Sequence, residues 1–202
     1  VIEWKGAAMY SNIEFSPDGN YVMAVTVEKP FSYLVPYYRF PSKTAIYDSG
    51  GSLVRTLLEV PLIEDLPKGF MAERPGMRDV SWRSDKPATL VYVEALDGGD
   101  PAVEVPFRDQ VFLLDAPFEG EGTPLLKTRN RFRGILWGTD SKAIANDLWW
   151  DTRNTKTYLF NPSDPGEDPI VLSDRNYQDR YSDPGSFATV LNQYDERVLA
   201  MD

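Results

Sequence analysis

The stretch IEFSPDGNYVMAV (residues 13–25) reads as two short strands joined by a tight polar turn. β-Branched and aromatic residues flank a Ser-Pro-Asp-Gly-Asn segment, a composition typical of an antiparallel hairpin. Similar segments, each with an aromatic residue before an aspartate-containing turn, follow at WRSDKP (residues 82–87) and WGTDSK (residues 137–142), and NQYDER (residues 192–197) is a looser copy. We expect Asp18, Asp85 and Asp140 each to bond the backbone two residues further on. One hairpin unit therefore recurs along the chain.

Strand-like segments fall into groups of four around these turns. They are predicted at residues 12–16, 21–27, 44–48 and 53–58, then 78–82, 89–95, 110–115 and 124–128, then 134–138, 142–150, 156–161 and 169–173, and finally 187–193 and 197–201. The best candidate for an amphipathic helix, residues 62–71, is broken by Pro67 and Gly69. The repeating units span about 9–60, 78–128, 134–175 and the start of another at 187–202.

Four strands per unit, repeated with a shared turn, predict an all-β fold, a β-propeller fragment of about three and a half four-stranded blades across residues 1–202. A β-sandwich is the alternative, and the four-strand repeat favours the propeller. A closed propeller has about four to eight blades. Because open blade edges are normally covered, we expect the chain to be part of a larger protein. The first two units exceed the roughly 40–50 residues of a typical blade and so carry insertions, at residues 28–41 and 96–109.

The amino-acid composition excludes several classes of function. The net charge is −10 and no run of Lys and Arg forms a basic face, so we expect no nucleic-acid binding. No apolar run approaches the roughly 18 residues needed for a membrane span. The sequence has no His and no Cys, which leaves no Ser-His-Asp triad, thiol nucleophile or cysteine-ligated zinc site. We therefore expect no catalytic residues, metal or cofactor in this segment, and the compartment stays open.

The insertions and one tight turn hold the candidate binding residues. EKPFSYLVPYYRFP (residues 28–41) places five aromatic residues around Arg39. It is either a rigid hairpin whose aromatic side chains complete the local core, or a substrate-facing rim where Arg39 binds an anion through its planar fork. The second insertion ends at Arg108, and its aspartates lack the further ligands of a calcium loop, so we expect a turn. Arg153 lies in a tight turn just after Trp149 and Trp150, whose side chains should face opposite sides of a strand.

Four segments resemble the propeller of glutamyl endopeptidases, members of the prolyl oligopeptidase family of serine peptidases: PFSYLVPYYRFP (30–41), WRSDKPATLVYVEALDGGDP (82–101), WWDTRNTKTYLF (149–160) and YSDPGSF (181–187). The resemblance covers nearly the whole chain. It implies that this propeller precedes or caps an α/β-hydrolase catalytic domain of the same parent chain, whose nucleophile lies in a G-x-S-x-G elbow. This segment has no such elbow, since Ser186 lacks the second glycine.

The resemblance thus implies a non-catalytic segment that gates access to the catalytic site and helps to position a peptide substrate. It also implies a parent that cleaves after Glu, with a periplasmic or secreted bacterial origin as one option. A buried substrate carboxylate needs a cation, and Arg39, Arg108 and Arg153 are the candidates from this segment. The alternative function is a free-standing propeller that acts as a protein-interaction module. A carboxylate-only hydrolase built on Asp97 and Asp100, or on Glu64 and Asp65, is a remote third option.

Overall fold

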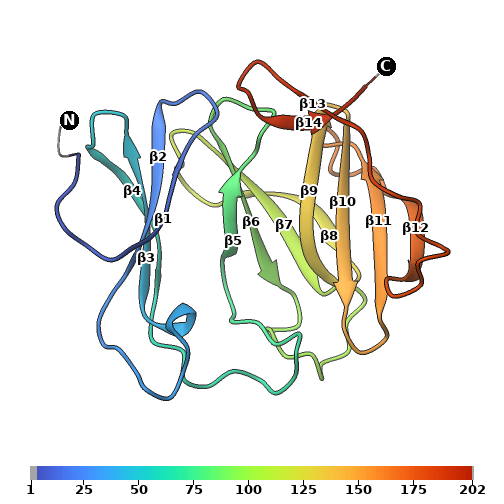
Figure 1. The fold of residues 1–202 in the computed structure, drawn as a ribbon, viewed down its shortest axis with the longest axis horizontal. Helices are drawn as coiled ribbons and strands as arrows, with labels where there is room; N and C mark the ends of the chain where they lie inside the picture. Colours follow the sequence, from blue (N-terminus) through green and yellow to red (C-terminus); the bar gives the residue numbers. More distant parts are fainter. Residues whose placement is uncertain (1–3, 202) are drawn as a thin grey trace.

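The computed structural model describes residues 4–201, so residues 1–3 and 202 at the limits of the expected domain lie outside the described residues. The chain forms strands joined by turns and loops, with one three-residue 3-10 helix, η1 (Tyr37–Arg39) (Figure 1). Over this range no helix has the length and apolarity required to cross a membrane. The strands are β1 (Tyr10–Phe15), β2 (Tyr21–Val27), β3 (Ser42–Asp48), β4 (Leu53–Val60), β5 (Arg78–Trp82), β6 (Thr89–Ala95), β7 (Asp109–Asp115), β8 (Thr123–Thr128), β9 (Arg131–Thr139), β10 (Lys142–Trp149), β11 (Asn154–Phe160), β12 (Ile170–Asn176), β13 (Thr189–Leu191) and β14 (Arg197–Leu199).

Consecutive strands pair antiparallel into separate sheets. Three sheets have four strands each, in the orders β1-β2-β3-β4, β5-β6-β7-β8 and β9-β10-β11-β12, and β13 pairs with β14 in a fourth sheet. We call these blade 1, blade 2, blade 3 and the half blade. Figure 1 shows the three blades side by side, with the half blade lying across one end of blade 3. The expected all-β fold of three and a half four-stranded units is confirmed.

Blade 2 is covered on both faces, which explains the unbroken apolar run in β6. Leu90 and Tyr92 face blade 1 and pack in one buried cluster with Met23, Ile46 and Phe118. Val91 and Val93 point the opposite way, into a second cluster with side chains of blade 3, among them Trp137, Ala143, Ala145, Tyr158 and Phe160. Because successive side chains in a strand alternate between faces, a strand packed on both sides must be apolar at every position. The main core therefore lies between blades.

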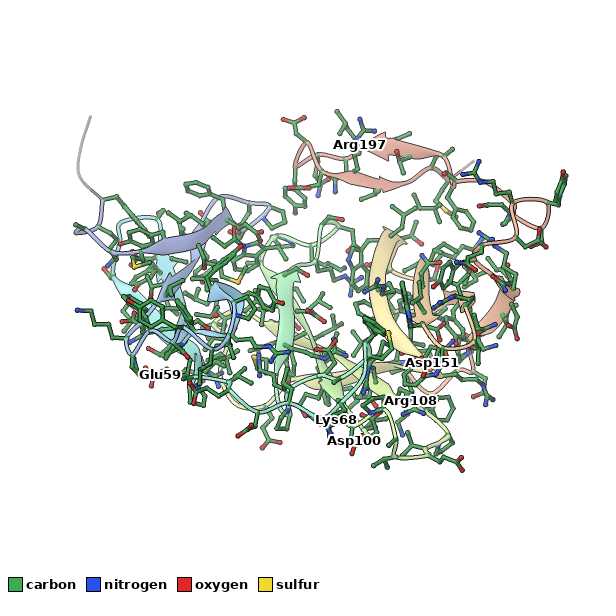
Figure 2. All side chains as sticks on the ribbon, turned by 60° about the horizontal axis from the view of Figure 1, so that its bottom comes forward. Glu59, Lys68, Asp100, Arg108, Asp151 and Arg197 are labelled. Carbon is green, nitrogen blue, oxygen red and sulfur yellow. The ribbon has the colours of Figure 1, made fainter. Side chains whose placement is uncertain are left out.

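The repeated turns gather at one end of the molecule and connect the blades there (Figure 1). The backbone N–H of Asp18 donates to the Pro87 carbonyl at 3.1 Å, Lys86 pairs with Asp140, and Asn192 Nδ2 donates to the Ser84 carbonyl at 2.8 Å. The opposite end holds the β2–β3, β4–β5 and β6–β7 connections. In Figure 2, Lys68, Asp100, Arg108 and Asp151 gather toward that end, away from Arg197 on the half blade.

Two sequence expectations for the turns need correction. Asp18 forms the expected Asx turn, accepting from the Asn20 N–H at 3.0 Å. The carboxylates of Asp85 and Asp140 instead pair with Arg83 and Lys86, because cations that the first turn lacks lie within reach of them. In the fourth turn Asn192, not the aspartate, accepts the backbone N–H two residues on, at 2.9 Å. The shared aspartate therefore serves more than one structural purpose.

Most strands begin or end one to three residues away from their predicted positions, and the start of β9 and the length of the half blade are two examples. β9 begins at Arg131, three residues before the predicted start, because this buried arginine replaces the apolar side chain that marks a strand. The half blade is shorter than predicted, with three residues per strand. β14 packs against β9 of blade 3, where the Leu199 side chain lies next to Gly138.

Candidate functional site

A cavity of about 670 Å³ opens between blades 1 and 2 at the end of the molecule that carries the insertions. Its walls come from β2, β3, β4, the β4–β5 connection (residues 61–77) and the start of β5. Apolar side chains cover much of the wall, and three arginines, Arg39, Arg74 and Arg78, line it together with Glu73 and Asp79. The cavity therefore combines a desolvating wall with several cations.

Arg39 is positioned by the backbone of the first insertion. Its N–H donates to the Pro36 carbonyl at 2.9 Å within η1, and its carbonyl accepts from the Ile63 N–H at 3.0 Å. The side chain is half-buried, and its Nε is buried without a hydrogen-bond partner. Among residues 4–201 no carboxylate lies within ion-pair distance of its guanidinium. Arg39 therefore presents an uncompensated cation to the cavity.

Arg74 lies on the β4–β5 connection and is satisfied only by neutral groups. Its guanidinium donates to the carbonyls of Pro75, at 3.2 Å, and Met77. Burial lowers the pKa of Arg74 from its ordinary value, as expected for a guanidinium that has lost water without gaining a direct carboxylate partner. Burial likewise raises the pKa of the neighbouring Glu73 carboxyl.

Arg78 connects the cavity to a buried ionic cluster. Its side chain is almost fully buried, its terminal nitrogens pair with Asp79 and Asp109, and its Nε has no hydrogen-bond partner. Arg131 bonds Asp109 at 2.9 Å and Asp97 at 2.8 Å, and its Nε donates to the Met71 carbonyl at 2.9 Å. The cluster joins β5, β7, β9, the β4–β5 connection and the second insertion.

Arg108, one of the three arginines predicted from the sequence, belongs to this ionic cluster. It donates to Asp97 at 2.8 Å and to the carbonyls of Pro101, at 3.2 Å, and Val103, at 2.9 Å, and it stacks on Trp149 at 3.9 Å. These bonds close the second insertion into a compact loop. The Arg108 guanidinium is therefore bound to partners within the protein.

Arg153 lies near the cavity but does not line it. It stands over the Trp150 ring at 4.2 Å and donates to the Trp150 carbonyl. Trp150 packs against Phe70 at 5.3 Å, and Phe70 lines the cavity. Trp149 and Trp150 thus contact different arginines, as their alternation predicted. The structure places Arg39 at the cavity and Arg153 beyond its rim, while Arg108 is held apart from both by internal bonds.

The aromatic side chains of the first insertion do not complete a core. Tyr33 is fully exposed, Tyr37 and Tyr38 are largely exposed, and only Phe31 and Phe40 stack, at 5.5 Å. Backbone bonds hold the insertion instead, including Glu28 N–H to the Pro41 carbonyl at 2.7 Å. The interpretation that these aromatic side chains complete the local core was therefore wrong.

Sequence reasoning missed Arg74, Arg78, Arg131 and Asp109. The available signal was the position of three of them, because charged residues at the first positions of otherwise apolar strands are candidates for buried pairs. Nothing in the local sequence distinguishes Arg74 from an exposed loop arginine. Across the described part of the chain no group of three or more Asp and Glu side chains is arranged so that it could hold a metal ion.

A second buried polar cluster lies inside blade 3. Asp147 accepts from Tyr158 Oη at 2.6 Å, from the backbone N–H groups of Asn130 and Lys156 at 3.0 Å each, and from Asn130 Nδ2 at 2.9 Å. Burial, together with the hydrogen bond to Asp147, raises the pKa of the Tyr158 phenol. This cluster fixes the β10–β11 pair that ends in Trp149 and Trp150.

The raised pKa predicts a loss of stability at alkaline pH. Because the pKa of Tyr158 is higher in the folded state, the stability that its neutral phenol contributes is fully present below the unfolded-state pKa of about 10. This stability is lost as the pH rises above that value. Replacing Tyr158 with Phe should therefore reduce the loss of unfolding free energy between pH 9 and pH 11 by about 1.4 kcal/mol. Urea unfolding at the two pH values measures this loss. Tyr33→Phe, at a fully exposed position, is the control and should retain the full loss; equal losses in both variants would refute the assignment.

Comparison with known proteins gives the following. No protein-family model matches the chain. It is 41% identical over 181 residues to a protein of Oryza sativa subsp. japonica named "Probable glutamyl endopeptidase, chloroplastic", covering 89% of this chain and 19% of that protein. It is 40% identical over 190 residues to the protein of the same name from Arabidopsis thaliana, covering 93% and 20%. The chain thus spans about a fifth of the length of these relatives.

Among solved structures, the β-propeller domain of the Trilobed protease from Pyrococcus furiosus matches with a TM-score of 0.45 and 13% identity, covering 84% of this chain and 43% of that chain. The resemblance drawn from four sequence segments is confirmed by the homology to the two plant proteins, which extends over about nine-tenths of this chain.

Proposed function

We propose that this chain, a homologue of one segment of the probable glutamyl endopeptidases, is the non-catalytic propeller part of a serine endopeptidase that controls access to its catalytic site and helps to position the peptide. The observation that carries the proposal is 40–41% identity over about nine-tenths of the chain. In this proposal a catalytic α/β-hydrolase domain of the same polypeptide supplies the nucleophile, and the parent cleaves after Glu.

Gating needs a rigid frame with loops at one end, and two features of the described residues support this role. The blades share continuous apolar cores, while the two insertions and the β4–β5 connection lie together at one end. The ionic cluster around Arg131 anchors the second insertion to the body. An extended peptide is narrow enough to pass such loops, whereas a folded protein is excluded. The end that carries the insertions is thus the substrate-facing end in this proposal.

Substrate positioning needs a cation, because a carboxylate taken out of water is strongly unfavourable when unpaired. Of the three candidate arginines, Arg39 lacks an ionic partner over residues 4–201, Arg153 stacks on an exposed tryptophan, and Arg108 is bonded internally. We therefore assign contact with the substrate to Arg39, with Arg153 near the entrance. Arg108 acts as a positioning residue that holds the second insertion.

Shortening the first insertion tests the gate. Val27 pairs with Ser42, and Glu28 N–H bonds the Pro41 carbonyl, so an Asn-Gly turn replacing residues 29–40 can close the β2–β3 hairpin without disturbing its register. In the full-length polypeptide, this deletion should raise cleavage of a folded protein severalfold relative to cleavage of a short Glu-containing peptide. The measurement is the ratio of the two rates. Because the deletion also removes Arg39, Arg39→Met is the control that removes the arginine but keeps the loop, and it should leave the ratio unchanged.

Two outcomes count against the proposal. A full-length polypeptide that cleaves no Glu-containing peptide contradicts the assignment to a peptidase. Peptide cleavage with an unchanged rate ratio contradicts the gate alone.

The second candidate function is a protein-interaction module, and the exposed aromatic residues of the first insertion favour it. Tyr33, Leu34, Tyr37 and Tyr38 are all strongly exposed on one loop, and tyrosines are enriched where proteins bind each other. A full-length polypeptide that is inactive on peptides, yet loses a partner when Tyr37 and Tyr38 become Ser, would support this alternative.

A further inference from the structure

We propose that the cavity between blades 1 and 2 is a binding site for a carboxylate on an aliphatic chain, held by Arg39 and Arg74 from two sides. This deepens the proposed function, on which it rests for the source of the ligand, an acidic side chain of a peptide. The new element is the pairing of Arg39 with Arg74, an arginine on a different loop that lines the same cavity.

The first argument is unbalanced charge. Arg39 has no ionic partner within the described range, and Arg74 bonds only to carbonyl groups. The acids that line the same cavity form no direct ion pair with either arginine, because Asp79 is paired with Arg78 and Glu73 has no salt bridge among residues 4–201. Partly buried guanidinium groups are stabilised by an anion when one enters.

The second argument is the presence of buried donors without acceptors. Arg39 Nε and Arg78 Nε are both buried and lack a hydrogen-bond partner, and Arg78 is only 5% exposed. Buried N–H groups without acceptors are rare in folded proteins and indicate a ligand or water that completes them. Arg78 lines the cavity and uses its terminal nitrogens on Asp79 and Asp109, so its Nε is the guanidinium donor that lacks a partner among residues 4–201.

The third argument concerns the kind of anion. Met23, Val25, Leu58, Val60, Ile63 and Leu66 line the cavity beside the arginines. These side chains suit the methylene groups of an acidic side chain, and they strengthen its ion pair by excluding water. A bare phosphate gains nothing from such a wall and loses more hydration. The lining therefore selects a carboxylate with an aliphatic stem.

Calorimetric titration of the full-length polypeptide tests the proposal without depending on catalysis. The probe is N-acetyl-4-aminobutyrate, which carries a carboxylate on a short aliphatic chain, and its neutral amide is the matched comparison. We expect the carboxylate to bind and the amide not to bind. Arg39→Met and Arg74→Met should each weaken binding by about tenfold or more, because each removes a charge-assisted hydrogen bond.

Two further variants make the result specific. Arg180→Met removes an exposed arginine and should leave the affinity unchanged. Arg39→Lys keeps the charge but loses the planar guanidinium, which can donate two hydrogen bonds to a carboxylate. Its affinity for the carboxylate should therefore lie between those of the wild type and Arg39→Met. Equal binding of the carboxylate and the amide, or unchanged affinity in both methionine variants, overturns the proposal. So does tighter binding of inorganic phosphate with the same dependence on Arg39 and Arg74.

The failure of this proposal is distinguishable from failure of the proposed function. Peptide cleavage is assayed separately, so binding that depends on both arginines in a polypeptide without peptidase activity supports the carboxylate site and rejects the peptidase. Peptidase activity without such binding supports the proposed function and rejects the carboxylate site.

Discussion

Replacing Arg131 with Met should lower the free energy of unfolding by about 3–5 kcal/mol, the usual cost of breaking a buried ion pair by removing one partner. Arg131 is 1% exposed and bonds two carboxylates, of Asp97 and Asp109, whose side chains are fully buried. Without it, Asp97 keeps only Arg108 and the Gly99 N–H, at 2.9 Å, and the Met71 carbonyl loses its donor. Methionine fills much of the volume, so the loss reflects charge more than packing.

Arg133→Met is the matched control, because Arg133 lies two residues further along β9 and is exposed. Unfolding in guanidinium chloride, followed by tryptophan fluorescence, measures the stability of both variants. Arg133→Met should change the free energy of unfolding by less than about 0.5 kcal/mol. A loss below about 1 kcal/mol for Arg131→Met would mean that water or the neighbouring arginines replace it, which contradicts a closed ionic cluster.

Gly99→Ala should destabilise the protein by about 2–5 kcal/mol through the combination of backbone strain and steric overlap. Gly99 has φ +84°, and a Cβ there would lie 2.0 Å from the Glu73 carbonyl oxygen. The same two residues are joined by a backbone bond from the Glu73 N–H to the Gly99 carbonyl, at 2.9 Å. The side chain would thus force the second insertion away from the β4–β5 connection that carries Arg74.

Gly98→Ala separates the two contributions. Gly98 also has a positive φ, +67°, but a Cβ there meets nothing within 4 Å. Gly98→Ala should therefore lower the free energy of unfolding by only about 1–2 kcal/mol, the cost of placing a residue with a Cβ in the left-handed region. Thermal and chemical unfolding of both variants measure the difference. Equal losses would show that the insertion moves aside freely, and that it is not held in place by the body of the protein.

The fold was predictable because its signals are local. The four-strand groups and the hairpin turns follow from alternation, β-branched residues and Asp-Gly or Asp-Ser turns, each visible within about ten residues. The run LVYV in β6 likewise agrees with a strand buried on both faces. In these elements, local pattern and tertiary packing favour the same structure.

The candidate site was only partly predictable because it depends on contacts between distant segments. Arg131 bonds the Met71 carbonyl across 60 residues of sequence and Asp97 across 34. Arg39 was found because it stands among aromatic residues, although four of the five proved to be exposed. Arg74 gave no signal, since its place at the cavity follows from how the β4–β5 connection crosses between blades. Charge in a sequence does not reveal whether water will surround it.

The ionic cluster also bears on how the repeats cooperate in folding. In arrays of repeated units, each unit contacts its neighbours, and stability is roughly the sum of unit and interface terms. Blades 1 and 2 meet through an apolar cluster and through hydrogen bonds to neutral carbonyl groups, including those of Arg55 to Phe118 and Gly120. Blades 2 and 3 meet through an apolar cluster and also share Arg131, whose charge is compensated only when Asp97 and Asp109 are in place. Blade 3 cannot detach without exposing or stranding buried charge, so we expect blades 2 and 3 to unfold as one cooperative unit.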